Sequence, residues 1–134
     1  MYISDSQTQP CRKGSEAWFT GTVWLEQIAA PPSPSRVRML RVSFEPGART
    51  AWHTHPVGQT LHVLTGIGCL QEKGGKIEII RPGDTVWIAP GELHWHGASP
   101  GHSMVHLAIQ ETDENGVDAV WAEHVLDEDY YRIA

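Results

Sequence analysis

Two histidines one residue apart, His53 and His55, have a spacing suited to metal chemistry. Side chains of a strand alternate between its two faces, so an H-x-H pair projects both imidazoles to the same side. In a helix the two rings would point about 200° apart, because one turn takes roughly 3.6 residues. A third ligand must come from elsewhere, and His94, after the turn signal APGE, is the natural candidate. Neutral imidazole binds Fe, Mn, Ni, Cu and Zn.

The segments that must position these histidines have the pattern of β-strands. Runs rich in β-branched and aromatic residues alternate with Gly/Pro turn signals such as EPGA, KGGK, RPGD and SPGH. This spacing predicts a single all-β sandwich or barrel. The runs cover residues 37–45, 60–72, 76–81, 84–89 and 103–111. The only helical pattern is DEDYYRI at 127–133, where we expect Asp127 to cap a short terminal helix.

Alternation within these runs predicts which side chains share the interior. Leu40 and Val42 alternate with the more polar Arg41 and Ser43, so we expect both to point inward. The same reasoning groups three further sets on inward faces: Gln59 with Leu61 and Val63, His94 with His96, and His106 with Ala108 and Gln110. We expect His62, His102 and His124 at the surface, and Arg41 and Arg49 as solvated charges or ion pairs.

Composition excludes several classes of function. The chain has 134 residues, a formal charge of −6 and scattered Lys and Arg, which does not suggest a nucleic-acid-binding surface. No apolar run approaches the roughly 18 residues of a membrane span, and the polar N-terminus does not resemble a signal peptide. We therefore expect a cytoplasmic protein that acts on a small molecule. Cys11 and Cys69 lack metal-site or redox spacing and are expected to be free thiols.

Two separated motifs resemble those of the cupin superfamily, which are small β-barrels. The first reads Gly47, ARTAW, His53, His55, PVG, Gln59, TLHVLT and Gly66. The second reads Gly83, DTVWI, Ala89, Gly91, EL and His94. There are three departures from the usual pattern: Gln59 replaces a glutamate, Ala98 replaces a closing asparagine, and the proline is shifted to Pro90.

A closer resemblance is to the bacterial cupin-type (R)-selective hydroxynitrile lyases. It is carried by WFTGTV at 18–23, FEPGARTAWHTHPVGQTL at 44–61, PGDTVWIAPGELHWHGA at 82–98, HLAIQE at 106–111 and EHVLDEDY at 123–130. The resemblance implies one jelly-roll cupin barrel over 1–134, with an N-terminal arm at 1–16 and metal motifs at 47–66 and 83–98. It also implies that a divalent metal, manganese first and otherwise Fe, Zn, Ni or Co, is held by four ligands: His53, His55, Gln59 and His94.

Gln59 is the departure that this subgroup shares, and it has a physical consequence. A neutral carbonyl oxygen leaves the metal its full 2+ charge, which makes a better Lewis acid and a better binder of anions. Alternatively, Gln59 could hydrogen-bond a ligand histidine without touching the metal. We expect the metal to bind the substrate oxygen while His106 takes or relays the hydroxyl proton. His96 or Gln110 would then steady the departing cyanide, and Leu40 and Val42 would shape the substrate pocket.

Other functions fit the same motifs, because one scaffold hosts many activities. A three-histidine site also suits an iron-dependent dioxygenase, and a small cupin can bind a metabolite or sense a metal without turnover. We expect a homodimer or homotetramer, with the segment WFTGTVW at 18–24 lying against a partner subunit.

Overall fold

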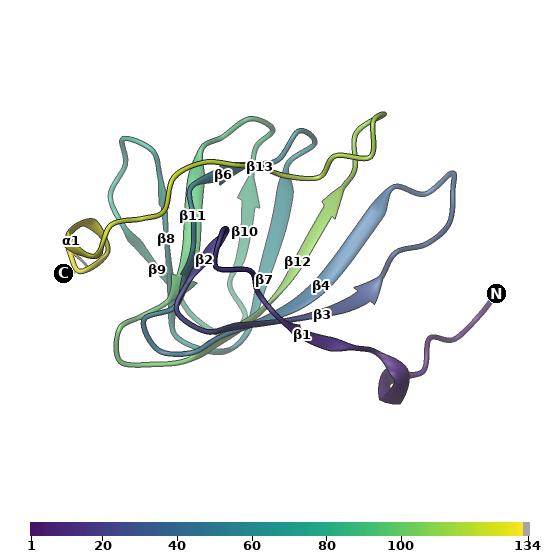
Figure 1. Cartoon of the computed structure of the whole chain (residues 1–134), viewed down its shortest axis with the longest axis horizontal. Helices are drawn as coiled ribbons and strands as arrows, with labels where there is room; N and C mark the ends of the chain where they lie inside the picture. Colours follow the sequence, from purple (N-terminus) through teal and green to yellow (C-terminus); the bar gives the residue numbers. More distant parts are fainter. Residues whose placement is uncertain (133–134) are drawn as a thin grey trace.

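Two antiparallel β-sheets face each other and carry the interior side chains between them (Figure 1). The computed structural model describes residues 1–132. The first sheet has the order β1–β3–β4–β12–β7–β10, with bounds Cys11–Lys13, Val23–Ala29, Val37–Phe44, Met104–Glu111, Gln59–Gly66 and Thr85–Ile88. The second contains β13, β6, β11, β5 and β2, with bounds Val120–Trp121, His53–Thr54, His94–Ala98, Arg49–Thr50 and Phe19–Thr20. Strands β8 (Gly68–Glu72) and β9 (Glu78–Ile80) extend it beside β11.

The register of β12 brings polar interior residues of distant segments together. This strand pairs with β4 on one side and β7 on the other. His106 lies opposite Val42 and Val63, and Gln110 lies opposite Gln59. Because directly opposite side chains on one face are neighbours, the pairing places the two glutamine amides within reach of each other.

Strand β11 organises the second sheet in the same way. It pairs with β8 along its length and, on its other side, with β6, where His94 lies opposite His53. The third partner is β5, where Gly97 lies opposite Arg49. A Cβ at Gly97 would lie 2.4 Å from the carbonyl oxygen of Ala48, so only glycine permits this close pairing. The close approach holds β5 against β11, the strand that carries His94.

Apolar packing occurs on both faces of the second sheet. Between the sheets, the largest fully buried members of the core are Phe44, Leu61 and Met104. On the outer face, a separate cluster contains Trp52, Cys69, Trp95, Val125 and Tyr130. Since side chains alternate along β11, Trp95 points into the outer cluster while its neighbours His94 and His96 point inward.

The C-terminal segment covers the outer cluster (Figure 1). Helix α1 (Asp127–Tyr130) is shorter than the predicted 127–133, and position 133 lies outside the described residues. The expectation that Asp127 caps this helix is wrong, because Leu126 is the N-cap residue and makes no side-chain capping bond. The Asp127 carboxylate instead lies 2.5 Å from Nη2 of Arg49, whose guanidinium is buried and requires a counter-charge.

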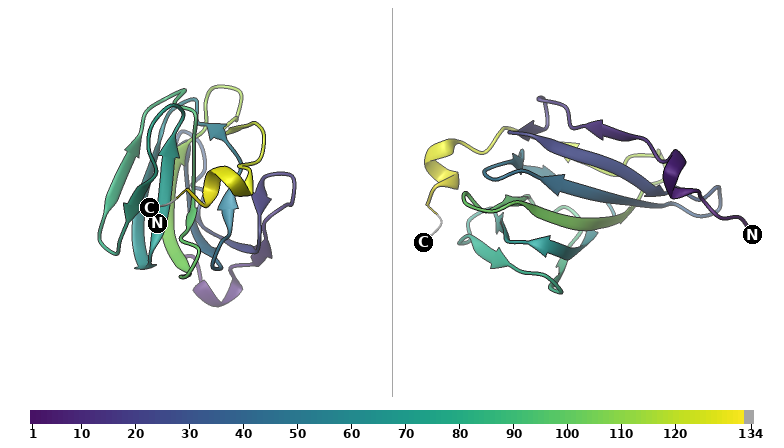
Figure 2. Two further views of the ribbon diagram at one scale, coloured as in Figure 1. Left: turned by 90° about the vertical axis from the view of Figure 1, so that its left-hand side faces the viewer. Right: turned by 90° about the horizontal axis from the view of Figure 1, so that it is seen from below.

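The expected N-terminal arm is partly incorporated into the first sheet. Strand β1 pairs with β3, so Cys11 lies in an edge strand, exposed and unbridged, while Cys69 is buried in β8. The chain before β1 extends away from the sheets, and the N-terminus and α1 lie at opposite ends of the molecule in the right-hand view (Figure 2). No helix within residues 1–132 is long and apolar enough to cross a membrane.

Candidate functional site

Three buried histidines lie within metal-binding distance of one another. Each of His53, His94 and His96 offers a ring nitrogen, and these atoms all lie within 4.8 Å of one another. The side chains project inward from β6 and β11, where His53 and His94 are directly paired. The ring of His55 is close by, with its centroid 4.9 Å from that of His53 and 5.5 Å from that of His94. Three histidines are positioned to bind a metal, as predicted, but the mutually close set contains His96 where the prediction has His55.

Main-chain carbonyls fix the tautomer of three of the four rings. A carbonyl oxygen only accepts hydrogen bonds, so the imidazole Nδ1 facing it must carry the proton. Nε2 then keeps its lone pair, which is the form that binds a metal. The three contacts join Nδ1 of His53 to the Ala51 oxygen (2.9 Å), Nδ1 of His55 to the Asp118 oxygen (2.6 Å) and Nδ1 of His94 to the Glu92 oxygen (2.8 Å).

Several acceptor atoms at this site are buried without a protein partner. Within the described chain they include Nε2 of His55, Nε2 of His94 and Oε1 of Gln59. A buried acceptor without a donor costs roughly 1–3 kcal/mol, and native proteins rarely leave several together. A cation would satisfy all three atoms at once, so the donor set fits a divalent metal.

Gln59 is oriented by a second amide. Its Nε2 donates to Oε1 of Gln110 at 3.1 Å, and Nε2 of Gln110 donates to Oδ2 of Asp118 at 3.1 Å. A carboxylate only accepts, so these two bonds determine which end of each amide points in each direction. The carbonyl oxygen of Gln59 is thereby left facing away from Gln110.

His96 differs from the other three rings in its partner. Its Nδ1 lies 3.0 Å from Nε2 of His106, and no main-chain carbonyl fixes its tautomer. Nε2 of His96 and Nδ1 of His106 are buried without partners among residues 1–132. One proton is therefore shared between two imidazoles, an arrangement suited to proton transfer rather than to fixed ligation.

Burial keeps the whole cluster neutral near pH 7. Desolvation lowers the pKa of His94 and that of His106 to about 4 each. The pKa of His53 and that of His96 also lie well below the ordinary value, because both rings are desolvated and surrounded by other imidazoles. The pKa of His55 is lowered as well, because desolvation outweighs the opposite effect of the nearby Asp118. Neutral rings are the form required both for metal binding and for accepting a proton.

A cavity of about 300 Å³ opens onto this array. His53, His55, Gln59, His96 and Gln110 form the polar part of its lining, while His106 lies behind His96 and does not line it. The rest of the wall is largely apolar and includes Phe19, Leu25, Leu40, Val42 and Trp121. The lining therefore combines an imidazole and amide part with an apolar part, and both predicted pocket residues belong to the apolar part.

Aromatic stacking connects the cavity wall to the histidines. The indole of Trp121 stacks on His53 with a centroid distance of 4.5 Å, and Trp18 stacks on Trp121 at 5.3 Å and 9°. Sequence reasoning missed Trp121, Asp118 and Arg12 as cavity residues. The first two lie in the segment after β12, where no alternation indicates a strand. The pairing of Trp121 with His53 and the hydrogen bonds of Asp118 to His55 and Gln110 place that segment at the site.

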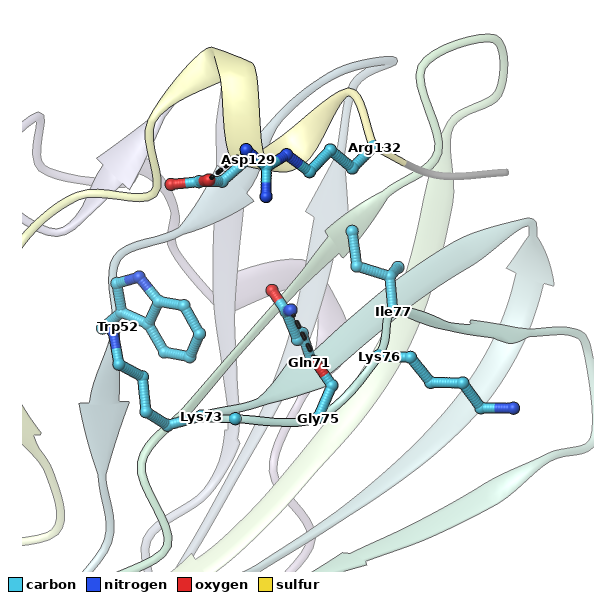
Figure 3. Close-up of a pocket in the computed structure, with 9 residues that line it drawn as sticks. Trp52, Gln71, Lys73, Gly75, Lys76, Ile77, Asp129 and Arg132 are labelled. Atoms are coloured by element: carbon cyan, nitrogen blue, oxygen red, sulfur yellow. Dashed lines mark hydrogen bonds and ion pairs between the residues drawn. The ribbon is translucent and has the colours of Figure 1, made fainter.

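A second cavity, of about 420 Å³, lies away from the histidines (Figure 3). Its lining comes from the turn after β8, from Trp52 and from the C-terminal segment. The ammonium of Lys73 lies 4.8 Å from the centre of the Trp52 ring, and Arg132 lies 3.9 Å from Asp129. No histidine is among the described residues that line it, so the candidate metal site is at the first cavity.

Comparisons with known proteins agree with this geometry. Residues 40–109, which contain both predicted metal motifs, match the family model described as "Cupin domain". The chain belongs to the cupin family. This cupin is 54% identical over 133 residues to an (R)-mandelonitrile lyase of Granulicella tundricola, a match that covers 98% of this chain and all of the relative. The prediction of a cupin related to the hydroxynitrile lyases is confirmed.

Solved structures give the same fold. A cupin-like protein of Thermotoga maritima superimposes with a TM-score of 0.84 and 41% identity, over 90% of each chain. A polyketide cyclase of Streptomyces resistomycificus has a TM-score of 0.76 at 20% identity, over 98% of this cupin and 91% of that chain. The predicted all-β cupin fold with a short C-terminal helix is confirmed, and the full-length similarity to a lyase shows that this cupin is an enzyme.

Proposed function

We propose that this cupin is a metal-dependent lyase that cleaves and forms cyanohydrins of apolar, in particular aryl, aldehydes. One observation carries the proposal: a buried imidazole and amide array with unpartnered acceptor atoms lines a cavity together with many apolar side chains. A cyanohydrin has the complementary shape, with a hydroxyl and a nitrile on one carbon and an apolar group beside them. The full-length relationship to an (R)-mandelonitrile lyase supports the same substrate class.

The residues that would hold the metal are His53, His55, Gln59 and His94. The three histidines have Nδ1 bonded to a main-chain carbonyl, which leaves Nε2 as the ligand atom. Gln59 offers its unpartnered carbonyl oxygen. Manganese is the first candidate, followed by Fe, Zn, Ni or Co, because imidazole and carbonyl ligands discriminate weakly between them. When bound, a divalent metal supplies a Lewis acid that lowers the pKa of an oxygen ligand.

The proton is handled by the His96–His106 pair. When His96 donates from Nδ1 to Nε2 of His106, its Nε2 carries the lone pair and can accept the hydroxyl proton of the substrate. His106 then accepts the Nδ1 proton and spreads the positive charge over both rings. In cleavage, the carbon–cyanide bond breaks with its electron pair on cyanide as the carbonyl forms. The abstracted proton returns to cyanide, which leaves as hydrogen cyanide.

Gln110 lies where it can steady the departing anion. Its amide lines the cavity beside Gln59, and its Nε2 is a donor. Leu40 and Val42 line the apolar part of the wall, where a substrate ring removed from water gains roughly 25 cal/mol per Å² of buried apolar surface. Binding of the apolar group would therefore orient the reacting carbon toward the imidazole and amide part.

The test is cyanide release from each enantiomer of mandelonitrile. Protein stripped of metal and reloaded with Mn²⁺ is expected to release cyanide from the (R) enantiomer preferentially, and stripped protein to do so only at background rate. His94→Ala should lose the bound metal and the activity together. His102→Ala removes an exposed histidine outside the cavity and is the matched control. Metal firmly bound without cyanide release above background would overturn the proposal.

We also propose that two copies of this cupin associate through the segment 18–24. Trp18 and Trp24 remain 44% and 40% exposed in the single chain, which is unusual for so large an apolar side chain. Light scattering should give the mass of a dimer or a tetramer, and Trp24→Glu should shift it toward the monomer. A cytoplasmic location remains a prediction from the sequence.

A further inference from the structure

We propose that Asp118 is the positioning residue of the metal site, since it fixes the carbonyl oxygen of Gln59 through Gln110 and the ring of His55 directly. This inference rests on the metal ligands assigned under the proposed function. Its subject, however, is how the ligands are held, which can be measured without any turnover.

Two hydrogen bonds join Gln59 to Gln110 and Gln110 to Asp118, and we call this chain the relay. The donor and the acceptor of each bond are fixed. The Asp118 carboxylate accepts from Nε2 of Gln110, and the Gln110 carbonyl accepts from Nε2 of Gln59, both at 3.1 Å. A carboxylate has no proton to donate, so Gln110 must present its NH₂ group to Asp118 and its oxygen to Gln59. Gln59 must in turn present its NH₂ group to Gln110. The outcome is a buried Oε1 of Gln59 with no protein partner.

A glutamine ligand needs a partner that fixes which end of its amide faces the metal, whereas a glutamate ligand does not. A carboxylate offers the same oxygen whichever way it turns, but an amide rotated by half a turn presents an NH₂ group to the metal. That orientation would set a positive dipole against a dication and remove a ligand. Position 59 holds glutamine where the usual motif has glutamate, so its amide must be held in one orientation. Asp118 supplies that orientation.

Asp118 acts on a second ligand through its main chain. Its carbonyl oxygen accepts the Nδ1 proton of His55 at 2.6 Å, so one residue contacts both His55 and the relay to Gln59. It is also the one acidic residue among those lining the cavity, where a negative charge favours a bound cation. Partners of this kind orient metal ligands, and their loss typically lowers metal affinity about 10–100-fold.

The segment that carries Asp118 is fixed at both ends. Before it, Oδ1 of Asp113 accepts from the backbone N–H groups of Asn115 and Val117 at 2.9 Å. After it, β13 pairs with β6, with Trp121 opposite His53. The main chain that carries the carboxylate is therefore held in place independently of the relay, as a positioning role requires.

The experiment measures Mn²⁺ affinity by titration and the electronic spectrum of Co²⁺-loaded protein. Asp118→Ala should weaken Mn²⁺ binding about 10–100-fold and alter the Co²⁺ bands, although the backbone bond to His55 remains. Asp118→Asn keeps an oxygen that can accept from Gln110 and should recover most of the affinity. Glu114→Gln removes a charge from the same loop at an exposed position and should leave both readouts unchanged.

A double-mutant cycle with Gln59→Glu separates orientation from charge. Because a carboxylate at position 59 needs no orientation, Asp118→Ala should lower Mn²⁺ affinity much less in that background than in the wild-type protein. An undiminished loss would show that Asp118 acts through its charge alone, which would overturn the proposal. If Asp118→Ala does not fold, Gln110→Ala breaks the same relay from strand β12 and should give the same spectral change.

The outcomes also separate this inference from the proposed function. Equal Mn²⁺ affinity in the wild-type protein and in Asp118→Ala would overturn the inference alone. Absence of cyanide release, together with the predicted loss of Mn²⁺ affinity in Asp118→Ala, would overturn the proposed lyase activity and leave the inference standing. Wild-type protein that binds no divalent metal would overturn both.

Discussion

Nδ1 of His96 lies 3.0 Å from Nε2 of His106, and only His96 of this pair lines the cavity. His106 can therefore act on a substrate in the cavity only through His96, which we call a series arrangement. Replacing His96 with Ala should lower kcat about 10²–10⁴-fold, the usual contribution of a positioned base. His106→Ala should cost less, because His96 can still accept a proton without it.

The double variant gives the sharper result for this pair. Since His106 acts through His96, combining both substitutions should cost no more than His96→Ala alone, as measured by kcat on (R)-mandelonitrile. Metal content should stay at the wild-type level in all three variants. Multiplicative effects of the two substitutions would contradict the series arrangement, and full activity in His106→Ala would remove that residue from the reaction.

Metal content should distinguish His55 from His96 as the third imidazole ligand. Ring nitrogens of His53, His94 and His96 are mutually close, but His96 Nδ1 bonds His106 whereas His55 Nδ1 is fixed by a backbone carbonyl. We therefore expect His55→Ala to lose bound metal and His96→Ala to retain it, as measured by elemental analysis after dialysis. The reverse pattern would move the metal to His53, His94 and His96.

Substrate size should depend on the apolar part of the cavity lining. Leu40→Phe adds volume to a wall of a space of only about 300 Å³, so kcat/KM for mandelonitrile should fall relative to that for a small aliphatic cyanohydrin. The discrimination expected for a group of this size is about 10–200-fold. Leu64→Phe, at a partly exposed position outside the cavity lining, is the control and should leave the ratio unchanged.

Acid should destabilise the metal-free protein through its buried imidazoles. Burial lowers the pKa of His106 to about 4 from an ordinary value of 6.5, so between these values the unfolded chain binds a proton that the folded chain does not. The free energy of unfolding is then highest above pH 6.5 and falls as the pH is lowered toward 4. His106 alone accounts for a decrease in the free energy of unfolding on the order of 3 kcal/mol. Denaturant titrations across this range should show a smaller decrease for His106→Asn.

The attachment of α1 should depend on one hydroxyl. The buried Tyr130 hydroxyl donates to the Ala98 carbonyl oxygen at 2.5 Å, next to the end of β11. Tyr130→Phe leaves that buried oxygen with only the weak Sγ–H donor of Cys69, 3.5 Å away, which should lower the free energy of unfolding by about 1–3 kcal/mol. Tyr131→Phe changes an exposed neighbour and should have little effect. Equal denaturation midpoints for the two variants would contradict this account.

The sequence by itself determined the strands and the histidine pattern. Alternation with a period of two placed Gln59 beside Leu61 on the inner face of β7, and it did the same for His106 and Gln110 on β12, because these runs are long enough to display it. The two cupin motifs were recognisable for a similar reason. Their glycines are required where the chain turns, and Gly66 has φ +80° with no room for a Cβ against Ser103.

Tertiary structure alone decided how the site residues are connected. Pairing of β11 with β6 set His94 against His53, and the pairing of β12 with β7 set Gln110 against Gln59. Asp118 and Trp121 carry no local signal, because their roles depend on contacts with Gln110, His55 and His53 that form only when the chain folds. The prediction that Asp127 caps the terminal helix was wrong for the same reason. Its local position favours a cap, but the buried Arg49, 78 residues earlier, takes its carboxylate.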